Sequence, residues 1–154
     1  MKSGIALAVL ALLLAGTAEA TPLFFPLSEH TMSMEVGPCG EPLQRSYTFT
    51  TADTQAVSWL KIWRDLKMHS VEWRWYSPNG RVYSRSFGVI PPVDGPAGYW
   101  SSCIWSDLAI RGYEVSLMPG TWKVDVFVDY RKVATELFTI GGNQVPCSKS
   151  YCRP

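Results

Sequence analysis

Residues 119–130, PGTWKVDVFVDY, alternate between apolar and polar side chains over almost their whole length. The apolar side chains stand at every second position: Trp122, Val124, Val126, Val128 and Tyr130. Because successive side chains of a β-strand point to opposite faces, this spacing predicts a long strand with one buried face. Phe127 is an aromatic residue on the otherwise polar face. It predicts that the C-terminal tail or a partner covers that face.

Further segments with strand-like patterns follow one another at regular spacing, with turn residues between them. They are residues 43–49, 56–63, 71–76, 81–87, 99–105, 113–118 and 132–140. Segment 56–63 is apolar on both faces, as a central strand can be. Residues 77–80, Ser-Pro-Asn-Gly, predict a tight turn, so that 71–87 forms a hairpin. Helical periodicity is missing, and about seven to eight strands predict an all-β, antiparallel β-sandwich.

Two segments resemble bacterial secreted domains of the immunoglobulin-like or fibronectin-III-like class. LMPGTWKVDVFVDYRKVATELFTI (117–140) resembles their closing hairpin, and VEWRWYSPNG (71–80) resembles their central strand and the turn after it. The resemblance implies an immunoglobulin-like sandwich and no particular activity, because such sandwiches carry many unrelated functions. Trp73, Trp75 and Trp122 are expected to form the core between the sheets.

The N-terminus has the pattern of a secretory signal peptide. A lysine precedes the apolar run 5–15, and Ala18-Glu19-Ala20 supplies small residues for cleavage before Thr21. The expected organisation is a signal peptide over 1–20, a β-sandwich domain over 21–140 and a cysteine-containing tail over 141–154. The mature chain is expected to be secreted or periplasmic and to have no membrane span.

Four cysteines remain after the predicted cleavage: Cys39, Cys103, Cys147 and Cys152. An even number in an exported chain predicts two disulfides. Cys147 and Cys152 are close enough in sequence to close a small loop, which would leave Cys39 to pair with Cys103. The alternative joins Cys39 or Cys103 to the tail. The C-x4-C spacing does not match a zinc site.

No motif for catalysis stands out. His30 and His69 are the two histidines, neither comes with a nucleophile elbow, and both are expected to be exposed or rim residues. Asp125 and Asp129 would lie about 13 Å apart along a strand, too far for a glycosidase pair, and are expected on a solvated face. We therefore expect a protein that is not an enzyme and has no resident cofactor.

One pattern raises the alternative of a copper-binding protein. His30, Met32 and Met34 are spaced by two, so on a strand their side chains share a face. One imidazole and two thioethers are soft ligands suited to Cu(I). The simpler interpretation is that Met32 and Met34 fill the core, as methionine commonly does.

Aromatic residues give the clearest indication of binding. The chain has 7 Trp and 7 Tyr, more than one small core can hold, so some should face solvent. We expect Tyr99, Trp100, Trp105 and Phe127 to mark a binding surface. With a net charge of +1 and no basic cluster, nucleic acid is an unexpected partner. The predicted function is binding to another exported protein or an envelope assembly, with a glycan as the alternative ligand.

Overall fold

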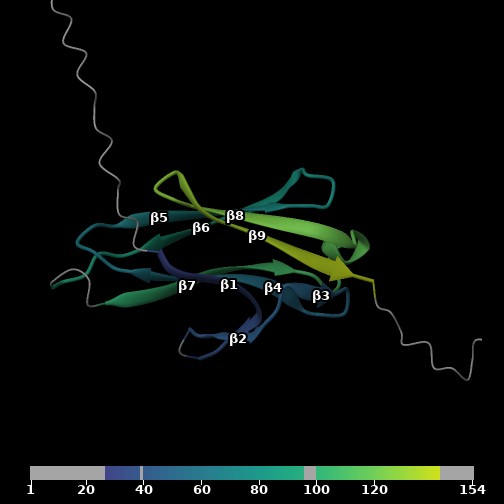
Figure 1. Cartoon of the computed structure of the whole chain (residues 1–154), viewed down its shortest axis with the longest axis horizontal. Helices are drawn as coiled ribbons and strands as arrows, with labels where there is room; N and C mark the ends of the chain where they lie inside the picture. The colour runs from purple at the N-terminus through teal and green to yellow at the C-terminus, as the bar shows by residue number, and fades with distance from the viewer. Residues whose placement is uncertain (1–26, 39, 96–99, 143–154) are drawn as a thin grey trace, which may run out of the picture.

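The computed structural model describes residues 27–38, 40–95 and 100–142 (Figure 1). This part of the chain forms nine β-strands and a short 3-10 helix, η1 (Glu114–Leu117). The strands are β1 (Leu27–Val36), β2 (Pro42–Arg45), β3 (Thr48–Thr50), β4 (Gln55–Trp63), β5 (His69–Tyr76), β6 (Val82–Ile90), β7 (Ser101–Ala109), β8 (Gly120–Val128) and β9 (Arg131–Gly141). The predicted all-β class is thus confirmed.

The strands form two sheets that pack face to face (Figure 1). The four-stranded sheet has the order β2-β1-β4-β7, and the five-stranded sheet has the order β3-β9-β8-β5-β6. In immunoglobulin terms, β1, β4 and β7 take the places of strands A, B and E. Strands β9, β8, β5 and β6 take those of G, F, C and C′. The predicted immunoglobulin-like sandwich is therefore confirmed by the strand order. Among the described strands, the one parallel pair is β3 with β9.

The core lies between the sheets and is rich in tryptophan. Trp73, Trp75 and Trp122 are at most 1% exposed, which confirms the predicted core. Val124, Val126 and Val128 are fully buried beside them. Phe138 meets Trp75 edge-on at 5.9 Å between ring centroids, and such pairs add stability beyond area burial. Tryptophans from β5 and β8 thus supply the largest side chains of the core.

The strand pattern misleads at two places. Residues 113–118 form η1 rather than a strand, because only Val115 of that helix is buried and no neighbouring strand pairs with the segment. Residues 43–49 divide into β2 and β3, which belong to different sheets. The alternation of β8 ends at Val128, because Asp129 and Tyr130 turn the chain with φ of 47° and 66°, and Tyr130 is 90% exposed.

The connection between β1 and β2 covers the outside of the four-stranded sheet. The indole of Trp59 donates a hydrogen bond of 2.6 Å to the Gly40 carbonyl, and Trp59 is buried although it points away from the core. Among the described residues, no helix has the length and apolar character needed to cross a membrane.

Candidate functional site

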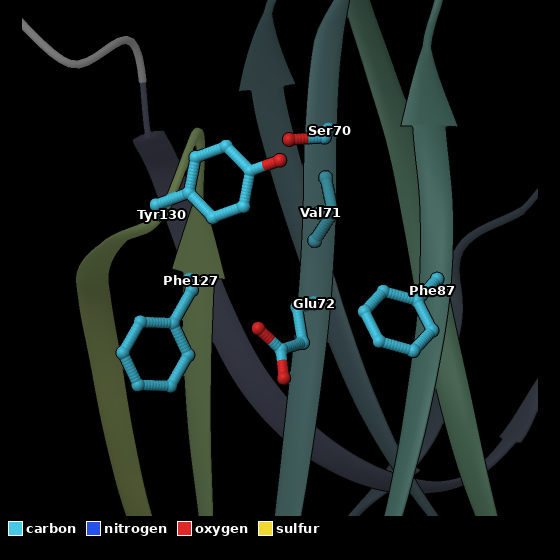
Figure 2. A pocket seen from close by; sticks show the side chains of 6 residues that line it. All are labelled: Ser70, Val71, Glu72, Phe87, Phe127 and Tyr130. Atoms are coloured by element: carbon cyan, nitrogen blue, oxygen red, sulfur yellow. The ribbon is translucent and has the colours of Figure 1, made fainter.

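The outer face of the five-stranded sheet carries a shallow hollow of about 310 Å³. Its lining comes from β5, β6, β8 and the turn after β8, and we call it the aromatic hollow (Figure 2). The lining residues are Ser70, Val71, Glu72, Phe87, Phe127 and Tyr130. Strand pairing aligns Phe127, Glu72 and Phe87 in one row across three strands. Because β-strand side chains alternate, these three project away from the core.

Phe127 is held in place by a charged neighbour. The guanidinium of Arg74 lies 4.0 Å from the Phe127 ring centroid, a cation–π contact. Arg74 also donates to both carboxylate oxygens of Glu72, at 2.7 and 2.8 Å. These hydrogen bonds lower the pKa of Glu72. Arg74 thus fixes one wall of the aromatic hollow, and it explains part of why an aromatic residue stands on this face.

A second stack lies on the same face, further along β5 and β8. The Lys123 ammonium is 3.8 Å from the Tyr76 ring centroid and 3.1 Å from Asp125. Asp125 also accepts a 2.7 Å hydrogen bond from Thr135. Burial opposes ionisation of Asp125, but the hydrogen bonds from Thr135 and Lys123 outweigh it and lower its pKa. The predicted solvated position of Asp125 is wrong, because this carboxylate is 4% exposed.

Exposed apolar side chains border the aromatic hollow. Phe87 is 74% exposed and Val89 is 59% exposed, and both point outward from β6. Exposed apolar groups in a row mark interaction surfaces. The sequence analysis did not predict Phe87 as a binding residue. The same pattern that marked Phe127 was present there, because Phe87 shares the outward face of its strand with Arg85, as Phe127 does with Lys123.

The turn that presents Tyr130 is clamped by His69. His69 Nδ1 lies 2.6 Å from Asp129, and Nε2 lies 2.9 Å from Asp65. Asp129 also accepts a hydrogen bond from the Ser70 amide. Burial alone would lower the pKa of His69, but the hydrogen bonds and charges of the two aspartates outweigh it and raise the pKa. The prediction of an exposed or rim histidine is wrong for His69, which is 7% exposed.

The two histidines have different surroundings. His30 lies between the Glu136 carboxylate and the Ser58 hydroxyl, which is fully buried, and His69 lies between two carboxylates. Both ring nitrogens of His69 approach carboxylates, and the Ser70 hydroxyl bonds to Asp129 rather than to the imidazole. His30 Nε2 contacts the Ser58 hydroxyl at 2.9 Å on the inner side of the sandwich. Asp125 and Asp129 are engaged by separate partners and do not face each other across a cleft.

His30, Met32 and Met34 lie on the same face of β1, as the spacing predicts, and that face is the inner one. Met32 is fully buried in the core and Met34 packs against it. Burial lowers the pKa of His30 to about 4, so its 3.3 Å approach to Glu136 is not an ion pair at neutral pH. These are the positions of core side chains, and copper binding stays a prediction.

We expect His30 to make the protein less stable in acid. A folded pKa near 4, below the ordinary 6.5, means that the unfolded chain binds the proton more readily. Stability from this group is therefore complete above about pH 6.5 and falls by about 3 kcal/mol on going to pH 4. Urea unfolding at pH 7 and pH 4 should show a smaller acid loss for His30→Gln than for the unmodified chain.

His69→Gln is the matched control, and its effect should have the opposite sign. The folded pKa of His69 is raised, so its contribution is present below about pH 6.5 and declines as the pH rises through the folded value. The His69→Gln variant should therefore lose more unfolding free energy between pH 7 and pH 4 than the unmodified chain does. If His30→Gln loses as much unfolding free energy between pH 7 and pH 4 as the unmodified chain, His30 is not the titrating group.

The other predicted binding residues lie away from the aromatic hollow. Trp100 is 57% exposed just before β7, and Trp105 is 44% exposed on the outer face of the four-stranded sheet. Trp63 is also exposed there, on the paired strand β4. Tyr99 lies outside the described residues. The structure brings Phe127 together with Phe87 and Tyr130, and not with the two predicted tryptophans; a glycan ligand stays a prediction.

Only Cys103 of the four cysteines lies within the described residues. It is half-buried on β7, forms no disulfide there, and burial raises the pKa of its thiol. Cys39, Cys147 and Cys152 lie outside the described residues. Gly40, the neighbour of Cys39, approaches Cys103 closely: a Cβ built on Gly40 would be 3.7 Å from the Cys103 Cβ. This places the chain next to Cys39 against β7.

Comparisons with known proteins give structural likenesses at low identity. No protein-family model matches the chain, and no curated protein matches it. An immunoglobulin-like protein from Pseudomonas aeruginosa is similar over 73% of this chain and 91% of its own, at 11% identity and a TM-score of 0.45. The alkylpurine DNA glycosylase AlkC from Pseudomonas fluorescens, bound to DNA with an abasic site analog, is similar over 73% of this chain and 30% of its own. Its identity is 13% and its TM-score 0.39, and neither likeness bears on activity.

Proposed function

We propose that this chain is an exported, non-catalytic interaction domain that binds another exported protein or an envelope assembly through the outer face of its five-stranded sheet. The observation that carries the proposal is the aromatic hollow, in which exposed Phe87 and Tyr130 stand beside Phe127 and Arg74. Aromatic and arginine side chains provide most of the binding energy in protein interfaces. The signal peptide pattern of residues 1–20 supports export.

The shape of the hollow favours a protein over a small molecule. Small ligands are enclosed by deep cavities that bury most of their surface. Here Phe87 and Tyr130 are 74% and 90% exposed, so the hollow is open along its rim. Its fixed ion pair, Arg74 with Glu72, is already formed and needs no reordering when a partner binds. A partner with a protruding apolar side chain would cover Phe127 and Phe87 together.

Photo-crosslinking tests this proposal. A benzoylphenylalanine at position 87 should yield one discrete crosslinked protein in the culture medium or periplasmic extract of the source cells. The matched control is the same group at position 117, because Leu117 is 81% exposed but lies in η1, outside the aromatic hollow. The same products from both positions, or none from position 87, would contradict the proposal.

A further inference from the structure

Strand β6 is a long, unprotected edge of the five-stranded sheet. Among the described residues it pairs with β5 and with no other strand. It has 9 residues and no proline, whereas the opposite edge, β3, has only 3 residues. Proteins usually shorten such an edge or block it with proline, because its free N–H and C=O groups accept a further strand. The edge β6 therefore has the backbone features of a strand-addition site.

Two contacts hold this edge close to the opposite sheet. The hydroxyls of Ser86 and Ser106 lie 2.5 Å apart, which links β6 to β7. Gly88 packs closely against the opposite sheet, since a Cβ there would come within 2.7 Å of the end of the Ile104 side chain. The middle of the inner side of β6 thus presents small residues, whereas Tyr83 and Ile90 near its ends pack into the core. An added strand would need small residues beside the middle positions.

The outer side of β6 carries a row of three larger residues. Arg85, Phe87 and Val89 alternate along the strand, and Phe87 is also part of the aromatic hollow. An added strand would place alternate side chains beside these three. Its central outward side chain would lie against Phe87 and extend the aromatic hollow. Two apolar side chains would match Phe87 and Val89.

We expect an acidic residue on the added strand at the position opposite Arg85. Arg85 is exposed, and its Nε lies 3.9 Å from a carboxylate oxygen of Glu72. Both oxygens of that carboxylate already accept hydrogen bonds from Arg74. The contact of Arg85 with Glu72 is therefore long, and its exposed guanidinium can also pair with an acid of a partner. Opposite charges directly across two strands stabilise the pair, and like charges oppose it.

This charge argues against three occupants from the same chain: β6 of a second copy and the two terminal segments. Strand β6 itself, VYSRSFGVI, contains no acid, so pairing with β6 of a second copy would leave both Arg85 side chains without one. The terminal segments 21–26 (TPLFFP) and 143–154 (NQVPCSKSYCRP) contain no acid either. The free edge β7 of the four-stranded sheet does carry an acid, Asp107, so pairing with β7 of a second copy is the competing outcome. A dimer of the mature chain in the absence of peptide would overturn a strand from another protein.

We infer that β6 receives an extended segment of a partner protein, which pairs antiparallel and reads apolar-x-apolar-x-acidic with small residues at x. This inference rests on the proposed function and adds the chemistry of the partner. The two apolar side chains lie beside Val89 and Phe87, and the acid pairs with Arg85. Backbone hydrogen bonds supply affinity and the alternate side chains supply selectivity.

A synthetic peptide tests the inference. The probe is fluorescein-labelled Lys-Thr-Val-Ser-Ile-Ser-Glu-Thr-Lys, and fluorescence anisotropy with the full mature chain should show saturable binding with a Kd below about 1 mM. Changing the peptide glutamate to lysine should weaken binding about tenfold or more. The variant Arg85→Glu should reverse this preference. Arg111→Glu, an equal charge change on an exposed loop, should leave it unchanged.

Two methylated peptides test the backbone contacts. N-methyl groups on one alternate set of amides face β6, and those on the other set face solvent, so one peptide should lose binding and the other should keep it. Equal behaviour of the two, absence of binding by the parent peptide, or an Arg85→Glu effect no larger than that of Arg111→Glu would overturn strand addition. Crosslinking from position 87 in the absence of peptide binding would reject strand addition and leave the proposed function standing.

Discussion

Replacing Trp73 by alanine should lower the free energy of unfolding by about 3–5 kcal/mol. Trp73 is 1% exposed and lies on β5, between β8 and the edge strand β6 of the five-stranded sheet. Its removal would leave a cavity between the sheets that the paired strands on either side cannot close. Chemical unfolding followed by circular dichroism measures the loss.

Two variants make this result specific to the core. Trp105→Ala removes an indole that is 44% exposed and should cost much less. Trp73→Phe keeps an aromatic ring and removes an indole N–H that has no hydrogen-bond partner among the described residues, so it should cost less than alanine. Equal losses for Trp73→Ala and Trp105→Ala would contradict a core centred on Trp73.

A disulfide between Cys39 and Cys103 should stabilise the mature protein by about 4 kcal/mol, the value for closing a loop of about 65 residues. Two thiols lose two protons and two electrons to the oxidising machinery of the exported compartment, and one S–S bond forms. The approach of Gly40 to Cys103 supports this pairing over one with the tail. Mass spectrometry of an unreduced digest should find the two cysteine peptides joined, and reduction should lower the stability by that amount.

The tail cysteines provide the control for this pairing. A double variant, Cys147→Ser with Cys152→Ser, should keep the joined peptides and most of the stability. Cys103→Ser should lose both. Peptides in which Cys39 or Cys103 is linked to the tail would contradict the pairing, and unchanged unfolding after reduction would contradict its structural role.

The sequence predicted the long strands and the buried face of β8 because alternation depends only on local spacing. It failed at 113–118, where the same alternation occurs without a neighbouring strand to pair with. It also could not divide 43–49 between two sheets, because β2 pairs with β1 and β3 pairs with β9, far away in the sequence. Such long-range pairing is not encoded in any one segment.

Only one residue of the candidate site was found from the sequence. Phe127 stood out as an aromatic residue on a polar face. Phe87 comes from β6, and the strand pairing that aligns it with Phe127 through β5 was unknown. Tyr130 was not predicted as a site residue, because the positive φ values of the turn that presents it are not evident from its residue types. Trp105 was selected for its ring alone, and the structure places it on the other sheet.

Partner binding through the aromatic hollow is tested most directly by affinity measurements with the crosslinked protein once it has been purified. Isothermal titration would compare two double variants, Phe87→Ala with Phe127→Ala and Trp63→Ala with Trp105→Ala, each checked for native circular dichroism. The first pair should weaken binding about 100-fold or more, as loss of two central aromatic residues does. The second pair, exposed on the opposite sheet, should change it little. Unchanged affinity in the first pair with a large loss in the second would contradict binding at the five-stranded sheet.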